Sequence, residues 1–495
     1  MKPNPNSHQM IHSTETEQAI PISSVSRDGL LSLALKNVEL FCSEDKIAFA
    51  RVRQSTHFEI HGVESEAFGD WLGQLALVES GEIASTHALK AAIDALRARA
   101  RFSGKTESVH LRAATQGGKY YIDLCDPCWR VIEIDADDWR ILSCSPVAFT
   151  RTAQMRALPE PATNGNFKRL LKVANIPEHH LAMVLAWCIE ALRPDTPYVG
   201  LELVGAQGSA KSTTQRMLRE LVDPNAGNLR VKPRSRSDIS VAGQNSHVIS
   251  YENLSGLSGD MQDALCSVLT GAADATRRFF TNSDEVVLKV KRPVMLNGIN
   301  RVVTQPDLVD RFISIELSPL AGVRSEIELQ AQFEALKPII FGGLLKWFSR
   351  ALAKLPEVQG EKPTLPRMAD FALLGEAVVR ARKGSPGEFL RKYQALRRKN
   401  VDQVIDASPV GAAVIASLDK KRERLSGTVK EVYEVLRRHY EAVRNGTGRG
   451  NEWPASEKAF ANELRRLAPA FKQLGVMIEI GERTARGYPC RIWRE

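Results

Sequence analysis

The feature of this sequence that most constrains its fold is the segment GAQGSAKST, residues 205–213. An apolar run, LELV, leads directly into it, and a helical pattern, STTQRMLRELV, follows. A glycine-rich loop between a buried strand and a helix directs backbone N–H groups and the positive end of the helix at phosphate oxygens. The segment therefore predicts a phosphate-binding loop (P-loop) in an α/β core with a parallel sheet.

We expect this loop to bind ATP together with Mg²⁺. The Lys211 ammonium would reach the β- and γ-phosphates, and the Ser212 hydroxyl would ligate the metal. Ala210 stands where the usual pattern has glycine, a substitution that a negative backbone φ would tolerate. The alternative is a glycine-rich turn that merely opens a helix. The residues expected to bind the cofactor are Gly205, Ala206, Gln207, Gly208, Ser209, Ala210, Lys211, Ser212 and Thr213.

Three more polar residues stand at the ends of predicted strands. The run HVISY ends before Glu252, a candidate for the metal shell or for orienting the attacking water. Because Tyr251 precedes it in place of a second carboxylate, Asn253 is kept as an alternative group to position water. Asn297 ends RPVMLN, where it would sense the γ-phosphate, and Arg311 precedes FISIEL, where it would reach a neighbouring subunit's nucleotide. The competing interpretations are a chance acid, a turn asparagine and an arginine in a surface ion pair.

The ordered set GAQGSAKST, HVISYENLSGL, TRRFFTNSDEVVLKVKRPVMLNGI and PDLVDRFISIEL resembles the ATPase domain of helicase-like replication proteins from phages and integrative elements, of the primase-helicase type. These proteins belong with the superfamily 3 and minichromosome-maintenance-like AAA+ helicases. The resemblance covers residues 166–320 well and 367–378 more loosely. It implies a DNA-dependent ATPase and replicative helicase that forms a ring, expected as a hexamer, in which Arg311 completes the site of the next subunit.

Basic residues in two regions are predicted to contact DNA. The family suggests a β-hairpin in the ring channel, and the stretch 276–291 fits that place. Near the C-terminus, the helix at 456–474 and the turn ERTARGYP between two strands match a winged helix, which would place positive charge on two sides of a groove. Solvated hairpin charges and a protein-docking winged helix remain open alternatives. The predicted contacts are Arg277, Arg278, Lys289, Lys291, Lys458, Arg465, Arg466, Arg483 and Arg486.

A chain of 495 residues is too long for one compact core, and changes of pattern divide it. The basic run 380–399 either lies along DNA or is a solvated face, and Pro356, Pro363 and Pro366 are expected to break helices. The predicted segments are a disordered tail (1–28), an N-terminal α+β domain of unknown role (29–160), the AAA+-like P-loop core (161–345), a helical basic linker or lid (346–425) and the winged helix (426–495).

The net charge of +9 favours a polyanionic partner such as single-stranded or forked DNA. A primase or another replication factor is a further expected partner. Seven scattered cysteines indicate reduced thiols, and the sequence shows neither a signal peptide nor a long apolar span. We therefore expect a cytoplasmic protein without a membrane partner.

Other chemistries have weaker support. Cys125 and Cys128 form CDPC, but no second ligand pair follows that would complete a zinc site. The run IEIDADDW (132–139) resembles the metal-binding strand of primases, yet its aspartates suit a hairpin turn and no histidine motif follows. The main rival is an ATP-switched DNA-binding initiator or adaptor that does not unwind DNA, which the lone carboxylate at Glu252 keeps open. A small-molecule kinase is opposed by the basic C-terminal segment.

Overall fold

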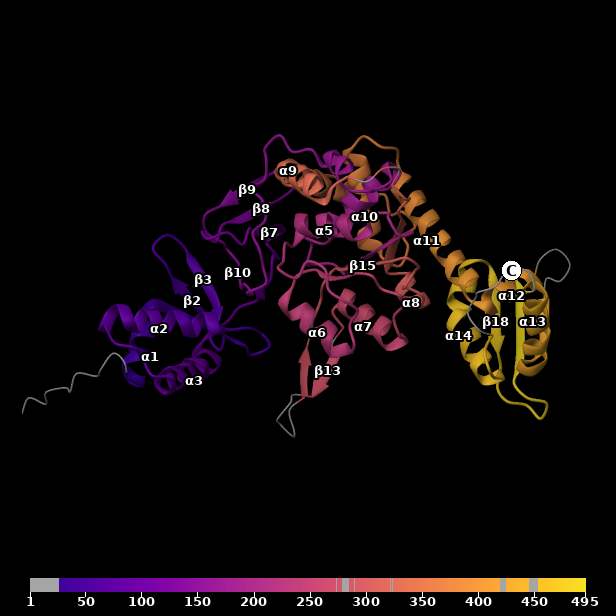
Figure 1. The fold of residues 1–495 in the computed structure, drawn as a ribbon, viewed down its shortest axis with the longest axis horizontal. Coiled ribbons are helices and arrows are strands. Elements are labelled where there is room, and N and C mark those ends of the chain that lie inside the picture. The colour runs from indigo at the N-terminus through magenta and orange to yellow at the C-terminus, as the bar shows by residue number, and fades with distance from the viewer. Residues whose placement is uncertain are drawn as a thin grey trace, which may run out of the picture. The chain divides into compact units, whose positions relative to one another are not determined.

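The protein forms two compact units, Met1–Val109 and His110–Glu495 (Figure 1). The expected domain at 29–160 spans this division, and most of the expected tail lies outside the described residues. At 274–277, 285–288 and 442–444 only the backbone is described. The computed structural model describes residues 26–272, 274–277, 285–288, 290–320, 322, 324–418, 424–444 and 453–495.

In the first unit, three helices pack on a four-stranded sheet of order β3-β2-β1-β4. Each helix begins after a serine whose hydroxyl accepts from a backbone N–H of the first turn: Ser26, Ser65 and Ser85. The elements are α1 (Arg27–Asn37), β1 (Val38–Cys42), β2 (Ala48–Arg53), β3 (Phe58–Gly62), α2 (Glu66–Ser80), α3 (Thr86–Ser103) and β4 (Lys105–Thr106).

The second unit begins with an antiparallel sheet whose strands follow in chain order. Gly117 and Gly118 both have positive φ and form the first hairpin turn. The Asp135 carboxylate accepts from the backbone N–H groups of Asp137 and Asp138, so these acids build a turn. The strands are β6 (Ala113–Gln116), β7 (Lys119–Asp123), β8 (Val131–Ile134) and β9 (Trp139–Leu142), with β5 (Val109–His110) before them and β10 (Ala148–Phe149) after them.

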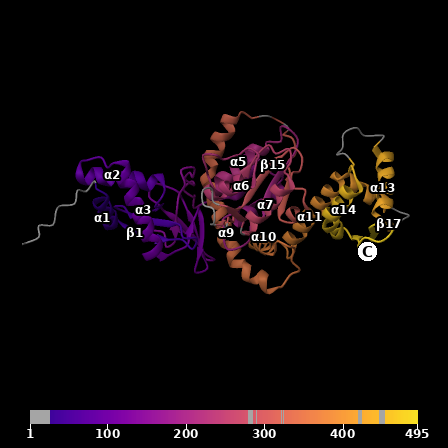
Figure 2. The ribbon, with the colours of Figure 1, turned by 90° about the horizontal axis from the view of Figure 1, so that it is seen from below.

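The predicted parallel sheet is confirmed, in the order β12-β15-β11-β16. Its strands are almost wholly buried, as expected of continuous apolar runs covered on both faces. Helices α5, α6 and α7 lie around it (Figure 2). The strands are β11 (Gly200–Val204), β12 (Ile249–Tyr251), β15 (Val294–Gly298) and β16 (Phe312–Glu316).

The connections between these strands are mainly helical, with one hairpin. Strands β13 (Asp274–Arg277) and β14 (Glu285–Leu288) pair antiparallel, which confirms the expected hairpin between β12 and β15. The helices are η1 (Phe167–Lys172) and η2 (Glu178–His180), both 3₁₀, and α4 (Leu181–Glu190), α5 (Lys211–Val222), α6 (Arg236–Asn245), α7 (Gly259–Thr270) and α8 (Pro306–Val309).

Three helices follow the sheet: α9 (Glu326–Gly360), α10 (Ala369–Ala381) and α11 (Glu388–Ala407). Helix α9 continues through Pro356, so the break expected there is wrong. Its middle is held by a close crossing, because an added Cβ on Gly342 would lie 2.0 Å from the Ala162 carbonyl oxygen. Helix α9 therefore belongs to the core, and the expected boundary at 345/346 falls inside it.

The C-terminal part has three helices and an antiparallel sheet of order β17-β19-β18. Phe460, Leu464 and Leu467 recur at helical spacing in the last helix and are fully buried. The elements are α12 (Pro409–Ser417), β17 (Arg424–Thr428), α13 (Val429–Arg444), α14 (Glu457–Gln473), β18 (Val476–Ile480) and β19 (Pro489–Arg494).

A fully buried ion pair joins the antiparallel sheet to the parallel one. Arg112 Nε lies 3.1 Å from an Asp223 carboxylate oxygen, and both side chains are 0% exposed. The other carboxylate oxygen accepts from the Val248 backbone N–H just before β12. Burial opposes ionisation of Asp223, but the charges of Arg112 and Arg219 outweigh it and lower the carboxyl pKa.

We expect Asp223→Asn to lower the free energy of unfolding by about 3–5 kcal/mol, because it leaves Arg112 buried without a counter-charge. Since the folded pKa of Asp223 is depressed, its contribution is present above the unfolded pKa and is lost as pH falls through the folded pKa. Urea unfolding at neutral and acid pH measures both effects. The control is Glu357→Gln, which alters the exposed pair with Lys354. It should change neither the free energy of unfolding at neutral pH nor its loss at acid pH. Equal stability of Asp223→Asn and the wild type at neutral pH would contradict the prediction.

Candidate functional site

The loop at 205–210 joins the carboxyl end of β11 to the first residue of α5, Lys211. Gly208 has φ +80° and Ala210 has φ +51°. The negative φ expected at Ala210 is therefore wrong. The sharp turn from strand into helix requires a left-handed residue at the helix N-cap, and alanine adopts it at a steric cost of about 1–2 kcal/mol. Gly205 is also required, since an added Cβ would lie 2.5 Å from the Leu317 carbonyl oxygen.

The Lys211 ammonium lies inside the loop. It donates to the carbonyl oxygens of Gly205 and Ala206, both at 2.8 Å, and contacts Ser209 Oγ at 3.4 Å. Burial lowers its pKa. A positive group is thus held in the concave side of a loop at a helix N-terminus, which is the arrangement that receives an anion.

A polar network connects α5 to the ends of β12 and β15. The Asn297 amide donates to Gln215 Oε1 at 2.7 Å and reaches Ser212 Oγ at 3.5 Å, while its oxygen accepts from the Asn253 backbone N–H at 2.9 Å. Gln215 in turn donates to Ser250 Oγ at 2.8 Å. The structure therefore brings Ser212, Asn253 and Asn297 together. Gln215 was missed by sequence analysis, although it stands one helical turn after Lys211 on the same face.

Glu252 follows β12 at the same edge of the sheet. Tyr251, just before it, lies beside Leu296 in the parallel register, and Leu203 lies beside Asn297. The Glu252 backbone N–H donates to the Arg230 carbonyl at 2.9 Å, and its side chain is partly exposed. Glu252 is thus placed near the network by the sheet, without a direct side-chain contact to it among the described residues.

Arg311 lies at the opposite edge of the sheet, just before β16. Its guanidinium contacts the Asp307 carboxylate at 3.2 Å. Because Gly200 at the start of β11 pairs with Phe312, Arg311 is separated from the loop of its own chain by the length of β11. A role for Arg311 at a phosphate site therefore requires a second copy of the chain.

Glu202, in the middle of β11, is wholly buried and holds the segment that follows β15. Its carboxylate accepts from the backbone N–H groups of Val302 and Val303 and from the Ser314 hydroxyl at 2.5 Å. Burial raises its pKa, while these donors oppose the shift. The role of this carboxylate is structural, because three hydrogen-bond donors of the protein occupy its oxygens.

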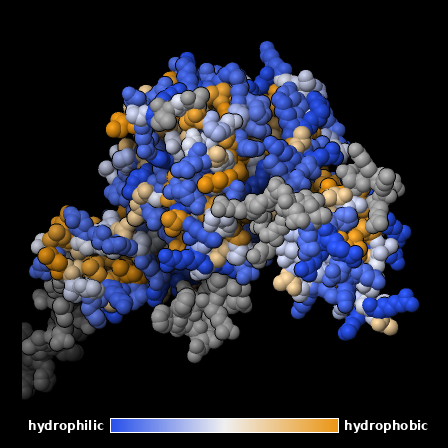
Figure 3. Space-filling model, turned by 45° about the vertical axis from the view of Figure 1, so that its right-hand side comes forward, coloured by the Kyte–Doolittle hydropathy of each residue, from blue (hydrophilic) through white to orange (hydrophobic). Residues whose placement is uncertain are grey.

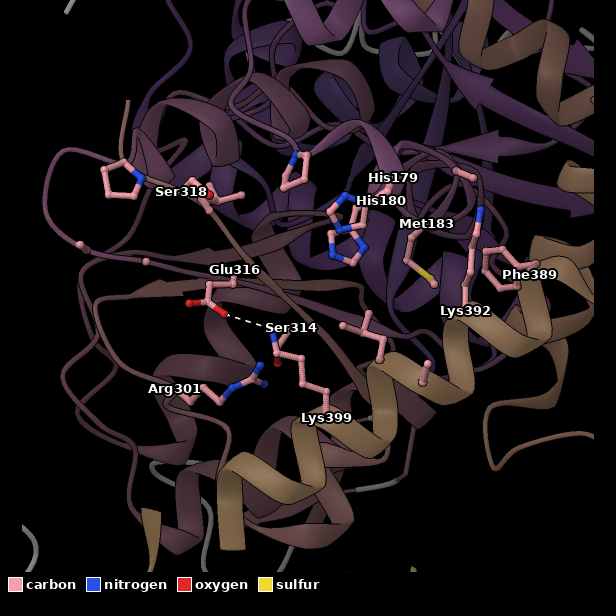
Figure 4. Close-up of a pocket in the computed structure, with 18 of the residues that line it drawn as sticks. His179, His180, Met183, Arg301, Ser314, Glu316, Ser318, Phe389, Lys392 and Lys399 are labelled. Atoms are coloured by element: carbon pink, nitrogen blue, oxygen red, sulfur yellow. Dashed lines mark hydrogen bonds and ion pairs between the residues drawn. The ribbon is translucent and has the colours of Figure 1, made fainter. Parts of the chain in front are cut away.

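A cavity of about 660 Å³ adjoins Gly205 and Ala206 (Figure 4). Met183 and Phe389 are among its apolar walls, and Lys399 pairs with Glu316 at 3.2 Å across it. His180 also lines the cavity, and burial lowers its pKa to about 4, so its ring is neutral at pH 7. The residues come from segments far apart in sequence, which is why sequence analysis missed the cavity.

The described residues contain no cluster of three or more histidine, cysteine or acidic side chains suited to hold a metal by themselves. Within the same described part of the chain, no helix is both long and apolar enough to cross a bilayer.

The residues predicted to contact DNA fall into two groups. Lys458 and Arg465 on α14, and Arg483 and Arg486 between β18 and β19, are exposed, and the C-terminal surface is largely hydrophilic (Figure 3). Arg466 differs from the expectation: it pairs with Glu463 and donates to the Thr304 carbonyl at 3.2 Å.

Lys291 also differs from the expectation. It lies after the hairpin, donates to the Pro194 carbonyl and sits 5.8 Å from the Tyr198 ring centroid. The side chains of Arg277, Arg278 and Lys289 lie outside the described residues. The hairpin of β13 and β14 is present, and contact of these three side chains with DNA stays a prediction.

We expect Ala210→Gly to stabilise the protein by about 1 kcal/mol, because glycine adopts the left-handed conformation without a steric cost. The matched control is Ala335→Gly, an exposed position inside α9, which should destabilise by about 1 kcal/mol. Urea unfolding of both variants measures the change in the free energy of unfolding, which should be positive for Ala210→Gly and negative for the control. A loss of stability in Ala210→Gly as large as that of the control would contradict the prediction.

Three solved structures show similarity to the chain. The SCCmec type IV Cch protein, described as an active helicase, is 11% identical, with a TM-score of 0.48 over 92% of this chain and 93% of its own. The apo C-terminal region of NrS-1 is 12% identical, with a TM-score of 0.37 over 94% and 98%. JCV helicase, with a bound small molecule, is 15% identical, with a TM-score of 0.23 over 45% and 65%. Comparison with curated proteins gave no match.

Two family models match the sequence itself. Residues 167–402 match the model of the actinomycete integrative conjugative element replication protein. Residues 410–494 match the model of the C-terminal domain of the same RepA family. The first match contains the loop, the parallel sheet and the polar network, and the second contains α14 and the strands around the basic turn. The chain belongs to this family of mobile-element replication proteins.

Proposed function

We propose that the protein is a DNA-dependent ATPase that acts as a ring-forming replicative helicase of a mobile element, of the superfamily 3 and AAA+-like type. The observation that supports this most directly is the Lys211 ammonium held inside a strand–loop–helix turn, beside the Ser212, Gln215 and Asn297 network. The replication role of the family supplies the biological setting.

In this proposal the loop is a P-loop. Phosphate oxygens replace the two carbonyl oxygens that Lys211 now contacts, and the backbone N–H groups of residues 205–213 surround them. The adjoining cavity has the size and the mixed apolar and polar lining suited to a nucleoside. Mg²⁺, when bound, would neutralise charge between the β- and γ-phosphates, and Ser212 and Glu252 are the residues proposed to serve it.

Hydrolysis would proceed at the carboxyl edge of the parallel sheet. Glu252 orients the attacking water, with Asn253 as the alternative group, and Asn297 senses the γ-phosphate from its fixed place in the network. Arg311 of one copy stabilises the transferring phosphoryl group on the next, which requires a ring. A hexamer is the proposed size.

The C-terminal fold is proposed to be a winged helix that binds DNA. Its helix α14 and the turn between β18 and β19 present exposed cations on two faces, as phosphate contacts on both sides of a groove require. Four residues are retained from the sequence prediction for this interface: Lys458, Arg465, Arg483 and Arg486.

An ATP-switched DNA adaptor remains a second candidate. The buried Tyr251, 3% exposed, stands where a second carboxylate would assist hydrolysis, which leaves Glu252 as the one acid after this strand. Strand displacement on a forked duplex separates the two functions, because only the helicase couples turnover to unwinding.

We expect single-stranded DNA to stimulate ATP hydrolysis, and Lys211→Ala to reduce the stimulated rate by about 100-fold or more, since it removes the cation that meets developing phosphate charge. Initial rates with Mg²⁺ at low salt measure this. Lys90→Ala, an exposed lysine on α3, is the control and should retain the wild-type rate. Wild-type protein that binds ATP and DNA but shows no stimulated turnover would favour the adaptor.

We expect Gln215→Leu to lower kcat about 10-fold while nucleotide affinity changes less than about 3-fold, because Asn297 loses the acceptor that orients its amide. Gln215→Glu, which retains an acceptor at this place, should recover part of the rate. Steady-state kinetics and binding of a fluorescent ATP analogue separate kcat from affinity. A change confined to affinity would assign Gln215 to binding and contradict the positioning role.

A further inference from the structure

A groove of about 520 Å³ lies between the basic helix α11 and the C-terminal end of α14, away from the loop at 205–213. Three arginines line it, Arg391, Arg397 and Arg398, together with Gln394 and Gln473. Among the described residues that line it there is no acidic side chain. Arg391 and Arg398 are exposed and stand seven residues apart, two helical turns, so they share one face of α11.

Arg397 is held differently from its two neighbours. Its side chain is 15% exposed, and one Nη atom lies 2.7 Å from the Asp310 carboxylate. Its Nε is buried and has no hydrogen-bond partner. A buried guanidinium donor without an acceptor is unfavourable, so a ligand that supplies an oxygen here is stabilised.

We propose that this groove binds the phosphodiester backbone of DNA. Guanidinium groups match phosphate oxygens with paired N–H donors, and the amides of Gln394 and Gln473 add neutral donors to the same oxygens. The described lining residues include no acidic side chain, so the charges of Arg391 and Arg398 meet no opposing carboxylate among them, whereas Arg397 is paired with Asp310. The groove is separate from the exposed cations of α14 and the β18–β19 turn, and it extends the proposed DNA path onto α11.

The groove is connected to Arg311 through side-chain contacts of one short segment, residues 307–311. The Asp310 carboxylate forms an ion pair with Arg397. It also accepts a hydrogen bond from the side-chain amide of Gln473 of α14 at 3.0 Å. Asp307, three residues earlier, contacts Arg311 and Arg367. A phosphate on Arg397 competes with Asp310, so DNA in the groove perturbs the turn that bears Arg311. This link to hydrolysis rests on the proposed function, whereas DNA binding does not.

Fluorescence anisotropy with a labelled single-stranded oligonucleotide, at several salt concentrations, tests the groove in the full chain. Arg391→Gln with Arg398→Gln should weaken binding about 10-fold and reduce the slope of log affinity against log salt by about 1.4, the value for two lost contacts to a single strand. The same positions changed to lysine should recover most of the slope, since charge is retained. Lys90→Gln with Arg99→Gln, exposed on α3, removes equal charge and should leave binding unchanged.

Unchanged affinity and slope in the glutamine variant would overturn the proposal. A polyglutamate peptide that binds the wild type as tightly as DNA, and loses binding in the same variant, would instead make the groove a protein-docking surface and also overturn it. Hydrogen exchange at residues 306–312 tests the link: DNA should change it in the wild type but not in the glutamine variant. Binding of a fluorescent ATP analogue is measured in parallel, so failure of the ATPase proposal is recognised separately from failure of the groove.

Discussion

The parallel pairing of β12, β15, β11 and β16 is the constraint on which the candidate site depends. Parallel strands bring their carboxyl ends to one edge, so residues nearly a hundred positions apart in the chain become neighbours. The register then decides which residues meet: Asn297 reaches both α5 and the segment after β12. Arg311 precedes its strand and must lie at the other edge. Buried Glu202 fixes the segment after β15, which keeps this edge ordered.

Much of this was predictable from the sequence, because the relevant signals are local. Unbroken apolar runs predicted the four parallel strands, and the aspartates of 132–139 predicted the turn between β8 and β9. The helix expected at 456–474 is α14. The predicted strand, loop and helix order around GAQGSAKST is confirmed, and α5 begins at Lys211, one residue before the helical pattern STTQRMLRELV.

What could not be predicted depends on contacts between distant segments. The sequence does not show that Ala210 is left-handed, because the conformation is imposed by the geometry of the turn. The sequence predicted that Arg466 and Lys291 contact DNA. In the structure each side chain donates a hydrogen bond to a backbone carbonyl of another segment. Pro356 ends no helix, because packing of α9 overrides its local preference. The contact of Gln215 with Asn297 and the cavity beside Gly205 likewise form only when α5, β15 and α11 pack together.

The buried pair of Arg112 and Asp223 has a consequence for dissecting the protein into fragments. A fragment begun at residue 161, the expected start of the P-loop core, would retain Asp223 and the Val248 N–H but lose the guanidinium that compensates them. The same cut would remove β6–β9, and with them Tyr120, Ile122 and Ile132 from the main hydrophobic core. A fragment that keeps the parallel sheet and its loop intact must therefore begin before β6, at the division between the two compact units. The antiparallel sheet is part of the same folding unit as the parallel sheet and is not a separable N-terminal accessory.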